Sequence, residues 1–398
     1  MNAFETLVAE NPQARAAKGT EHTVREIAQQ PECWEKAAQL LAGRKTEICA
    51  FLEQAGLRGN AQATLILTGA GSSEFVGNAI APALRKNLKR QVLSLSTTDI
   101  VTHPERVFAP GTAPVVLSFA RSGNSPESLA TYRLVRQLSP KTKQIAITCN
   151  PDGALAKEAK ADPNGLYIAL PEETNDKSLV MTSSFSTMAL AAAALGLVDH
   201  PENLSALSAP VAAAGRRILS EYGDTIYKFA ARPFNRACYL GSGALNGTMQ
   251  ECHLKLQEMT EGRVVCTFNS FVGLRHGPQV FVNSECLVVA ALSTDPYVRG
   301  YELDMLRELK AKKQGAGTLA IVDRTIPDLK ELADEVIELA PLGPFIADEY
   351  RVMTDVMVGQ ILGTFKCMSL GLRPDNPSVS GTINRVVQGV NIYPFKRN

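Results

Sequence analysis

The 398-residue sequence lacks an excess of charge of either sign. Its 41 Lys and Arg residues nearly balance its 40 Asp and Glu residues, which leaves a formal net charge of +1. Proteins that bind nucleic acids or anionic membranes usually carry a clear basic excess. We therefore expect neither a nucleic acid nor a membrane as a partner, and any anionic ligand has to be small and locally held.

The sequence also lacks paired cysteine motifs and long apolar runs. Its eight cysteines are scattered without a CxxC pair, which favours free thiols in a reducing compartment over disulfides or a zinc site. The longest apolar run, residues 188–198, is shorter than the roughly 18 residues of a membrane span. The N-terminus has neither the basic start nor the apolar stretch of a signal peptide. These absences predict a cytoplasmic protein.

The chain contains an internal repeat. An apolar run at residues 65–69 leads into a Gly-x-Gly turn, and a similar run and turn recur 172 residues later, at residues 237–243. Four further apolar runs recur in the same order, at 92–95 and 264–267, 115–117 and 287–289, 145–147 and 319–321, and 166–171 and 336–341. Short apolar runs that alternate with helix-length segments are typical of parallel βαβ units.

We therefore predict an α/β fold of two tandem three-layer αβα sandwiches, each with a five-stranded parallel sheet, plus flanking helices. The helices are expected within residues 21–56, 182–229 and 345–372. The predicted domains are a helical segment at 1–60, a first sandwich at 61–215, a second at 216–373 and a C-terminal tail at 374–398. The tail contains three prolines, so we expect a loop that lies near a site.

Two loops that follow predicted strands of the first half are rich in hydroxyl groups and glycine. Residues 69–73 read Gly-Ala-Gly-Ser-Ser, and residues 118–128 contain four serines around Asn124, with Ser125 at the expected N-cap of a helix. Ligands of parallel sheets bind at the carboxyl ends of the strands, where helix N-termini present unpaired N–H groups. Together the two loops predict a phosphate site.

Two other interpretations of these loops remain open. Serine and glycine mostly cap helices and form turns, which is the ordinary structural interpretation of either loop alone. A dinucleotide site is disfavoured, because the third glycine of the GxGxxG fingerprint is replaced by Glu74 and Asp99 lies too far along the chain.

The second half has different chemistry. Its loop at 292–296 contains Asp295, which disfavours a second anion site, and its first loop has lost the paired serines. It carries instead a predicted helix at 248–260 with Glu258 near the end, followed by His276 before Gly277-Pro278. The alternative is that Glu258 simply pairs with Lys255 on a solvated helix face and that His276 only forms a turn.

The motifs resemble a known family. GAGSSEF at 69–75, SFARSGNSPES at 118–128, MTSSFST at 181–187, KLQEMT at 255–260 and LRHGP at 274–278 are similar to tandem sugar isomerase (SIS) domains and to the isomerase half of glucosamine-6-phosphate synthase. The tail segment 377–390, PSVSGTINRVVQGV, resembles that of the tagatose-6-phosphate ketose/aldose isomerases, whose members include galactosamine-6-phosphate deaminases.

The resemblance implies roles for individual residues. Glu258 matches the carboxylate that moves a proton between C1 and C2, and His276 matches a histidine associated with ring opening, which a neighbouring subunit supplies in the synthase. A homodimer with a shared active site is therefore implied. The synthase also has an active-site lysine in its tail, whereas the tail signature here offers Thr382, Asn384 and Arg385, and Lys396 lies in a different context. The residues expected to bind substrate and phosphate are Gly71, Ser72, Ser73, Arg121, Ser122, Asn124, Ser125, Ser128, Thr182 and Ser183.

We expect an isomerase that is also a hydrolase, converting galactosamine 6-phosphate to tagatose 6-phosphate and ammonia through an enolamine, without a metal or another cofactor. A simple aldose–ketose isomerase of the tagatose-6-phosphate type and a non-catalytic sugar-phosphate sensor are the alternatives. The sequence does not distinguish galacto from gluco stereochemistry, or a dimer from a tetramer.

Overall fold

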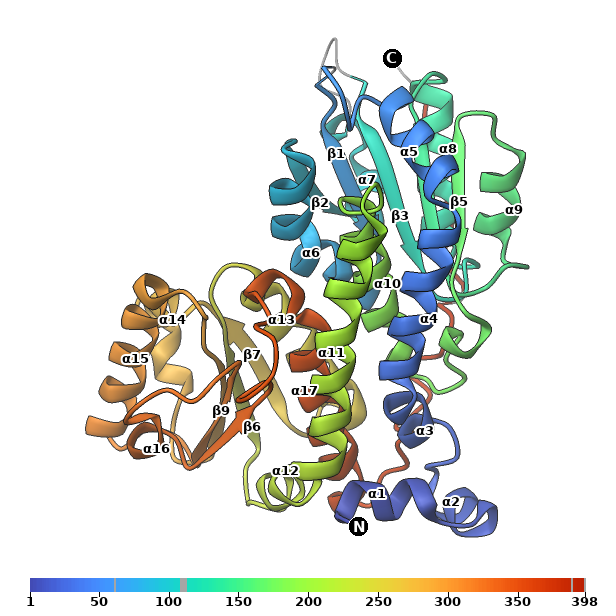
Figure 1. The fold of residues 1–398 in the computed structure, drawn as a ribbon. Coiled ribbons are helices and arrows are strands. Elements are labelled where there is room, and N and C mark those ends of the chain that lie inside the picture. The colour runs from blue at the N-terminus through green and yellow to red at the C-terminus, as the bar shows by residue number, and fades with distance from the viewer. Residues whose placement is uncertain (61, 108–112, 388, 397–398) are drawn as a thin grey trace. The chain divides into compact units, whose positions relative to one another are not determined.

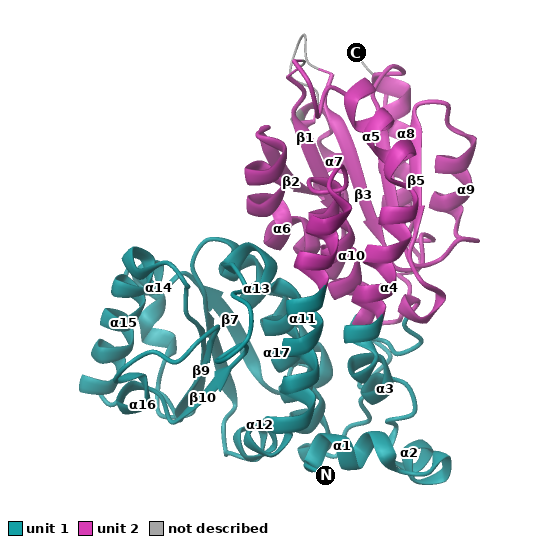
Figure 2. Cartoon of the chain, viewed as in Figure 1, with its two compact units in different colours: residues 1–32, 176–182, 209–382 teal, residues 33–175, 183–208, 383–398 magenta. Residues whose placement is uncertain are grey.

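Among the residues that the computed structural model describes, ten strands form two all-parallel, five-stranded sheets (Figure 1). The structure describes residues 1–60, 62–107, 113–387 and 389–396. The chain divides into two compact units (Figure 2): unit 1 comprises residues 1–32, 176–182 and 209–382, and unit 2 comprises residues 33–175, 183–208 and 383–398. Each unit contains one sheet. The domain boundaries expected from the sequence stay a prediction.

The first sheet, in unit 2, has the strand order β2-β1-β3-β4-β5. Its strands are β1 (Leu65–Gly69), β2 (Val92–Ser96), β3 (Val115–Ala120), β4 (Gln144–Thr148) and β5 (Gly165–Ala169). Every residue of the three central strands is buried, because helices cover both faces of the sheet.

The second sheet, in unit 1, has the order β10-β9-β8-β6-β7. Its strands are β6 (Arg236–Leu240), β7 (Val265–Asn269), β8 (Cys286–Ala291), β9 (Gly317–Val322) and β10 (Glu335–Glu338). When the strands are numbered within their own half, both sheets have the same order, with the first strand between the second and the third. The predicted α/β fold with two five-stranded parallel sheets is confirmed.

Helices cover the first sheet on both faces. Leu67 of β1 points toward α6 (Ser72–Leu88), against which α10 (Ser183–Leu195) packs. On the other face, Ile66 of β1 packs with residues of α7 (Thr97–Thr102) and α8 (Pro126–Leu138), and α9 (Ala154–Ala161) lies next to α8. All thirteen residues of α10 are buried, which matches its apolar and small side chains.

The second sheet has the same three layers. On one face lie α13 (Ala244–Met259) and α17 (Val352–Ser369), which pack closely on each other. On the other face lie α14 (Phe271–Leu274), α15 (Pro296–Ala311) and α16 (Leu329–Leu332), whose apolar side chains form one core with Cys238, Leu240 and Val288 of the strands. Figure 1 shows the two helical layers of unit 1 on either side of this sheet.

The remaining elements flank the two sandwiches. The α-helices among them are α1 (Ala3–Ala9), α2 (Pro12–Lys18), α3 (Thr23–Ala28), α4 (Gln30–Gly43), α5 (Lys45–Gln54), α11 (Pro201–Glu221) and α12 (Gly223–Ala230). The short 3₁₀ turns are η1 (Pro104–Arg106), η2 (Glu172–Thr174), η3 (Pro278–Phe281) and η4 (Asp348–Tyr350).

Two predicted helical segments differ in detail from the structure. The segment expected at 345–372 becomes helical only at Val352, since the carboxylate of Asp348 binds Thr294 and the chain there forms the 3₁₀ turn η4. The helix expected at 248–260 begins earlier, at Ala244, directly after Gly243. The tail at 374–398 has no helix or strand in its described residues, as expected.

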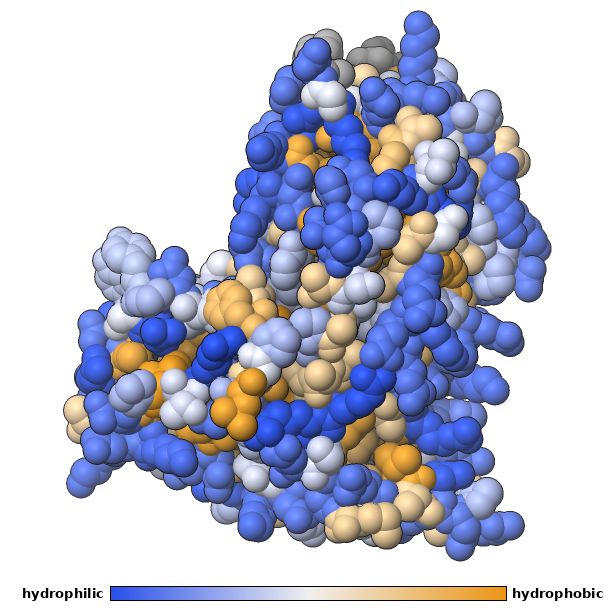
Figure 3. Space-filling view, viewed as in Figure 1, coloured by the Kyte–Doolittle hydropathy of each residue, from blue (hydrophilic) through white to orange (hydrophobic). Residues whose placement is uncertain are grey.

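The surface drawn in Figure 3 is mostly hydrophilic on each unit, with apolar residues gathered in smaller patches. Within the described part of the chain, no helix combines the length and the apolar character that a membrane span requires.

Candidate active site

The first glycine-rich turn is shaped by two glycines that no other residue could replace without strain. A Cβ at Gly69 would lie 2.4 Å from the backbone of Ser73, where the helix crosses close to the strand end. Gly71 has φ 56° and ψ −127°, a conformation that side chains with a Cβ rarely adopt. The turn therefore positions the start of α6 directly over the carboxyl end of β1.

The second half repeats this turn without the two serines at the start of the helix. Gly243 has φ 57° and ψ −124°, nearly the values of Gly71, and Gly241 makes the same close approach to the following helix. The helix of the first half begins with Ser72 and Ser73, whereas the equivalent helix begins with Ala244 and Leu245. The geometry is duplicated, but the paired serines at the start of the helix belong to the first half and are replaced by Ala244 and Leu245 in the second.

The loop after β3 is fixed by hydrogen bonds from its own polar side chains. The Ser122 hydroxyl accepts from the Asn124 N–H at 3.2 Å, and the Asn124 side chain accepts from the Ala154 N–H at 3.0 Å. The Asn150 side chain donates to the Ser122 carbonyl at 2.9 Å. Asn124 therefore orders the loop through α9, so a structural role is shown for it and a ligand contact stays a prediction.

Ser125 occupies the N-cap position of α8, as expected, but its side chain does not cap the helix. Its hydroxyl donates instead to the Ser128 hydroxyl at 2.6 Å, and Ser128 is buried. The two hydroxyl groups lie at the first turn of α8, where the helix dipole favours an anion. Both loops thus present serine hydroxyls at helix N-termini on the carboxyl edge of one sheet.

Arg121 connects the second loop with the C-terminal tail inside unit 2. Its buried guanidinium donates to the carbonyl oxygen of Arg385 at 2.6 Å, and the Arg385 guanidinium donates to the Asn175 side chain at 2.8 Å. The tail residue Arg385 therefore contacts the predicted phosphate loop. Sequence reasoning identified Arg121 but did not pair it with the tail, because loops carry no periodicity from which a long-range contact follows.

Ser183 begins α10 at the same edge of the first sheet as Ser72. The helices α10 and α6 pack together, and a Cβ at Gly196, just after α10, would touch Asn87 near the end of α6. Since their C-terminal ends meet, the two helices run in the same direction and both start at the carboxyl edge. Thr182 belongs to unit 1, where its N–H donates to the Asp176 carboxylate at 2.8 Å.

A buried ion-pair cluster on α13 contains Glu258. The Lys255 ammonium lies 2.5 Å from a Glu258 carboxylate oxygen and 3.3 Å from Glu251. The side chains of Lys255 and Glu251 are 1% and 0% exposed, while that of Glu258 is 24% exposed. Burial alone would lower the pKa of Lys255, but the two carboxylates outweigh it and raise that pKa. Glu258 is therefore the one member of the cluster that a ligand can reach.

The sequence-based alternative for Glu258 is correct about the contact and wrong about its setting. Lys255 and Glu258 do pair, yet the pair is not on a solvated helix face. Glu251 was not singled out, although its spacing of four residues before Lys255 and seven before Glu258 puts all three on one helix face. That spacing was the available signal.

His276 lies in an exposed turn after α14. Gly277, with φ 116°, allows the chain to reverse there, and Arg275 anchors the turn to α15 through a 2.7 Å ion pair with Glu308. Within the described ranges no side-chain hydrogen bond or ion pair of His276 occurs. Its imidazole is therefore exposed and accessible to another molecule.

The second sheet separates Glu258 from His276. Glu258 is on α13, which packs with α17 on one face, whereas the turn of His276 is tied to α14 and α15 on the other face. The structure brings the serines of the two loops to one sheet edge in unit 2 and the Lys255 cluster to one helix in unit 1. It does not bring Glu258 and His276 of one chain together.

Comparison with known proteins agrees with the fold and with these motifs. A model of the SIS domain matches residues 60–197. The chain is 37% identical to the D-galactosamine-6-phosphate deaminase AgaS of Escherichia coli, over 96% of this chain and 98% of that protein. It is 38% identical to the AgaS deaminase of Shewanella sp. (strain ANA-3), over 94% of this chain and 92% of that protein.

A solved structure shows the same similarity. The crystal structure of tagatose-6-phosphate ketose/aldose isomerase from Escherichia coli superposes with a TM-score of 0.85 at 33% identity, covering 94% of this chain and 97% of that one. The fold and the serine loops thus define a protein built on the SIS domain. More narrowly, the chain belongs to the family of the AgaS proteins, which confirms the resemblance inferred from the motifs.

Proposed function

We propose that the protein is an enzyme that converts D-galactosamine 6-phosphate to tagatose 6-phosphate and ammonia. The names of its AgaS relatives and of its tagatose-6-phosphate isomerase neighbour support the substrate class. The observation that carries the proposal is the partly exposed Glu258, held by a buried lysine on a helix. A protein that only binds a sugar phosphate has no need for such a carboxylate.

The serine loops would hold the phosphate of the substrate. Ser72, Ser73, Ser122 and Ser128 offer hydroxyl donors, Gly71 leaves the helix N-terminus accessible, and Arg121 supplies a buried positive charge. Anchoring the remote phosphate orients the reacting carbons for the proton transfer. We assign the same binding role to Ser125, Asn124, Thr182 and Ser183 as an expectation that mutagenesis can test.

Glu258 would act as the base. In the open-chain amino sugar, the aldehyde makes the C2 proton acidic, so a carboxylate above C1 and C2 can remove it and return it to C1 through an enolamine. The imine left at C2 reacts with water, and the C2–N bond breaks to give ammonia and the ketose phosphate. Lys255 would orient the carboxylate through its ion pair, which makes it a positioning residue.

His276 would open the sugar ring, since imidazole exchanges protons near neutral pH. Because the second sheet separates it from Glu258 of the same chain, we propose that His276 completes the site of a neighbouring copy in a homodimer. Val272 and Val280, four residues before and after His276, are exposed apolar side chains, as expected near a surface that a partner covers.

The eight cysteines all carry free thiols, which supports the expectation of a reducing, cytoplasmic compartment. We expect neither a nucleic acid nor a membrane as a partner, because the charge of the chain is balanced.

Ammonia release from galactosamine 6-phosphate tests the proposed reaction, with glucosamine 6-phosphate and the N-acetylated hexosamine phosphates as comparison substrates. We expect Glu258→Gln to remove turnover while the affinity for the phosphate ester stays nearly unchanged, and Glu285→Gln, an exposed carboxylate of the same unit, to behave as the wild type. Interconversion of aldose and ketose phosphates without ammonia would favour a simple isomerase. Binding without any turnover would favour a sensor.

A further inference from the structure

A pocket of about 240 Å³ opens at the carboxyl edge of the second sheet, within unit 1. It lies where β8 and β9 end, next to Leu292 and Val322, and the proposed reaction uses none of its residues. Its volume is just below the range of about 300–1,000 Å³ usual for ligand pockets, so it suits a metabolite smaller than a nucleotide. We propose that this pocket binds a small phosphorylated sugar as a second ligand site, independent of the proposed reaction.

Arg299, in the first turn of α15, provides the anion-binding group. Its guanidinium donates to the carbonyl oxygens of Ser293 and Thr294, each at 3.3 Å, through one of its nitrogen atoms. In the part of the chain that the structure describes, no carboxylate forms an ion pair with it. A half-buried guanidinium with donors to spare is suited to two parallel hydrogen bonds with a phosphate.

The loop after β9 supplies groups that recognise hydroxyls. The Asp323 carboxylate accepts from the Ile346 N–H and from Arg324, both at 3.2 Å. Burial raises the pKa of Asp323, and the Arg324 guanidinium, 3.2 Å away, compensates its charge. The Thr325 hydroxyl, which has no hydrogen-bond partner among the described residues, also lines the pocket. With Arg299 and Arg324 against Asp323, the lining carries a net positive charge and hydroxyl-binding oxygens.

An aromatic wall completes the pocket. The Phe345 side chain is 56% exposed, and the Arg324 guanidinium lies 5.7 Å from the centre of its ring. Aromatic faces with a few placed polar groups are typical of small-molecule sites, and the C–H face of a sugar ring packs well on such a surface. A free inorganic ion would not need this wall.

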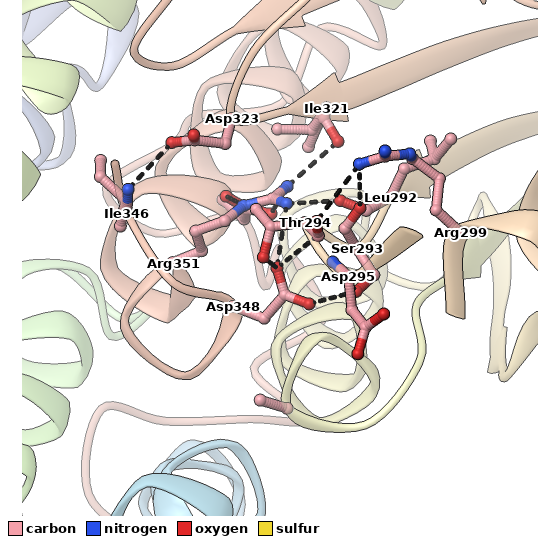
Figure 4. A network of polar contacts seen from close by, with 12 residues as sticks. Leu292, Ser293, Thr294, Asp295, Arg299, Ile321, Asp323, Ile346, Asp348 and Arg351 are labelled. Carbon is pink, nitrogen blue, oxygen red and sulfur yellow. Dashed lines mark hydrogen bonds and ion pairs between the residues drawn. The ribbon is translucent and has the colours of Figure 1, made fainter. Parts of the chain in front are cut away.

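Hydrogen bonds from Asp348 and Arg351 fix the loop after β8, which forms one side of the pocket (Figure 4). The Asp348 carboxylate accepts from the Ser293 hydroxyl, from the Thr294 N–H at 2.9 Å and from the Thr294 hydroxyl at 2.8 Å. The fully buried Arg351 donates to the carbonyl oxygens of Leu292 and, at 3.0 Å, Ile321. A preformed loop lowers the entropic cost of binding.

Asp295 does not oppose an anion in this pocket. The sequence suggested that its charge would repel a phosphate after β8. In the structure its carboxylate accepts from the Tyr297 N–H at 2.8 Å and caps α15, and it does not line the pocket. The proposed site lies between the carboxyl ends of β8 and β9.

Calorimetric titration of the full chain with fructose 6-phosphate, and separately with inorganic phosphate, tests the second site. We expect two sugar-phosphate sites per chain in the wild type. Arg299→Gln should weaken one of them by about tenfold or more, because it removes a charge-assisted pair of hydrogen bonds. Arg307→Gln, which removes an exposed arginine from the same helix, should leave both sites intact.

Two further variants keep the outcomes distinct. A Ser72→Ala and Ser73→Ala double variant should lose the other site and keep the one that depends on Arg299. Thr325→Val, at an exposed position that does not affect folding, should weaken fructose 6-phosphate at this site and leave inorganic phosphate unchanged. The proposal would be overturned by a single site per chain that is lost only in the serine variant, or by two sites that Arg299→Gln leaves unchanged. It would also be overturned if fructose 6-phosphate bound no more tightly than inorganic phosphate at the second site.

Discussion

Glu26 makes the stability of unit 1 depend on pH. It is buried on α3 and binds the segment that leads to Thr182: one of its carboxylate oxygens accepts from the Lys177 N–H at 2.5 Å, and the other accepts from the Ser178 hydroxyl. Burial, reinforced by the nearby Asp176 carboxylate, raises the pKa of Glu26 from 4.5 to about 7. The folded state thus binds a proton that the unfolded state releases at lower pH.

The sign of the effect follows from linkage. The stabilising contribution of the protonated Glu26 is fully present below pH 4.5, and it is lost as the pH rises through about 7. Over that interval the free energy of unfolding should fall by about 3 kcal/mol because of this group. Glu26→Gln removes the titration but keeps a carbonyl oxygen for the Lys177 N–H.

Urea unfolding at about pH 4 and about pH 8.5 measures the effect, because these pH values lie on either side of the transition between pH 4.5 and about 7. From the lower to the higher pH, the free energy of unfolding of Glu26→Gln should rise by about 3 kcal/mol relative to that of the wild type. Glu21→Gln changes an exposed carboxylate two residues before α3, so it is the matched control and should follow the wild type. Parallel pH profiles of Glu26→Gln and the wild type would refute the reasoning.

Three other perturbations have defined outcomes. Gly71→Ala should cost about 1–3 kcal/mol of stability through backbone strain, which thermal unfolding measures, and it should weaken phosphate binding. Gly243→Ala, in the equivalent turn, should cost a similar amount of stability and leave the affinity for phosphate unchanged. Lys255→Met should lower the free energy of unfolding by about 3–5 kcal/mol, because it leaves the fully buried Glu251 without its cation, and it should also reduce ammonia release; wild-type values of both would contradict the proposed role. Arg351→Met should destabilise by a similar amount, about 3–5 kcal/mol, by leaving the buried Asp355 uncompensated, which urea unfolding would detect.

The strands were predictable because parallel sheets covered on both faces require continuous apolar runs, which the sequence displays twice in the same order. The start of α17 was not, since it depends on Asp348 binding a loop that lies 54 residues earlier. Helix periodicity alone cannot anticipate such a contact.

The candidate site was predictable to a different extent in each half. Gly71 and the serines that follow it could be identified because a strand, a turn and a helix start are local features. The burial of Lys255 could not, because a lysine and a glutamate three residues apart are usually solvated, and here α17 covers their helix. The contact of Arg121 with Arg385 spans 264 residues and has no local signal.

The separation of Glu258 and His276 by a sheet has a genetic consequence. If each site takes its glutamate from one copy and its histidine from the other, two inactive mutants can complement each other. Mixed before assembly, Glu258→Gln and His276→Asn chains form hybrids in which one site lacks both groups and the other has both. Random pairing would restore about a quarter of full activity. If all catalytic groups came from a single polypeptide, such a mixture would remain inactive.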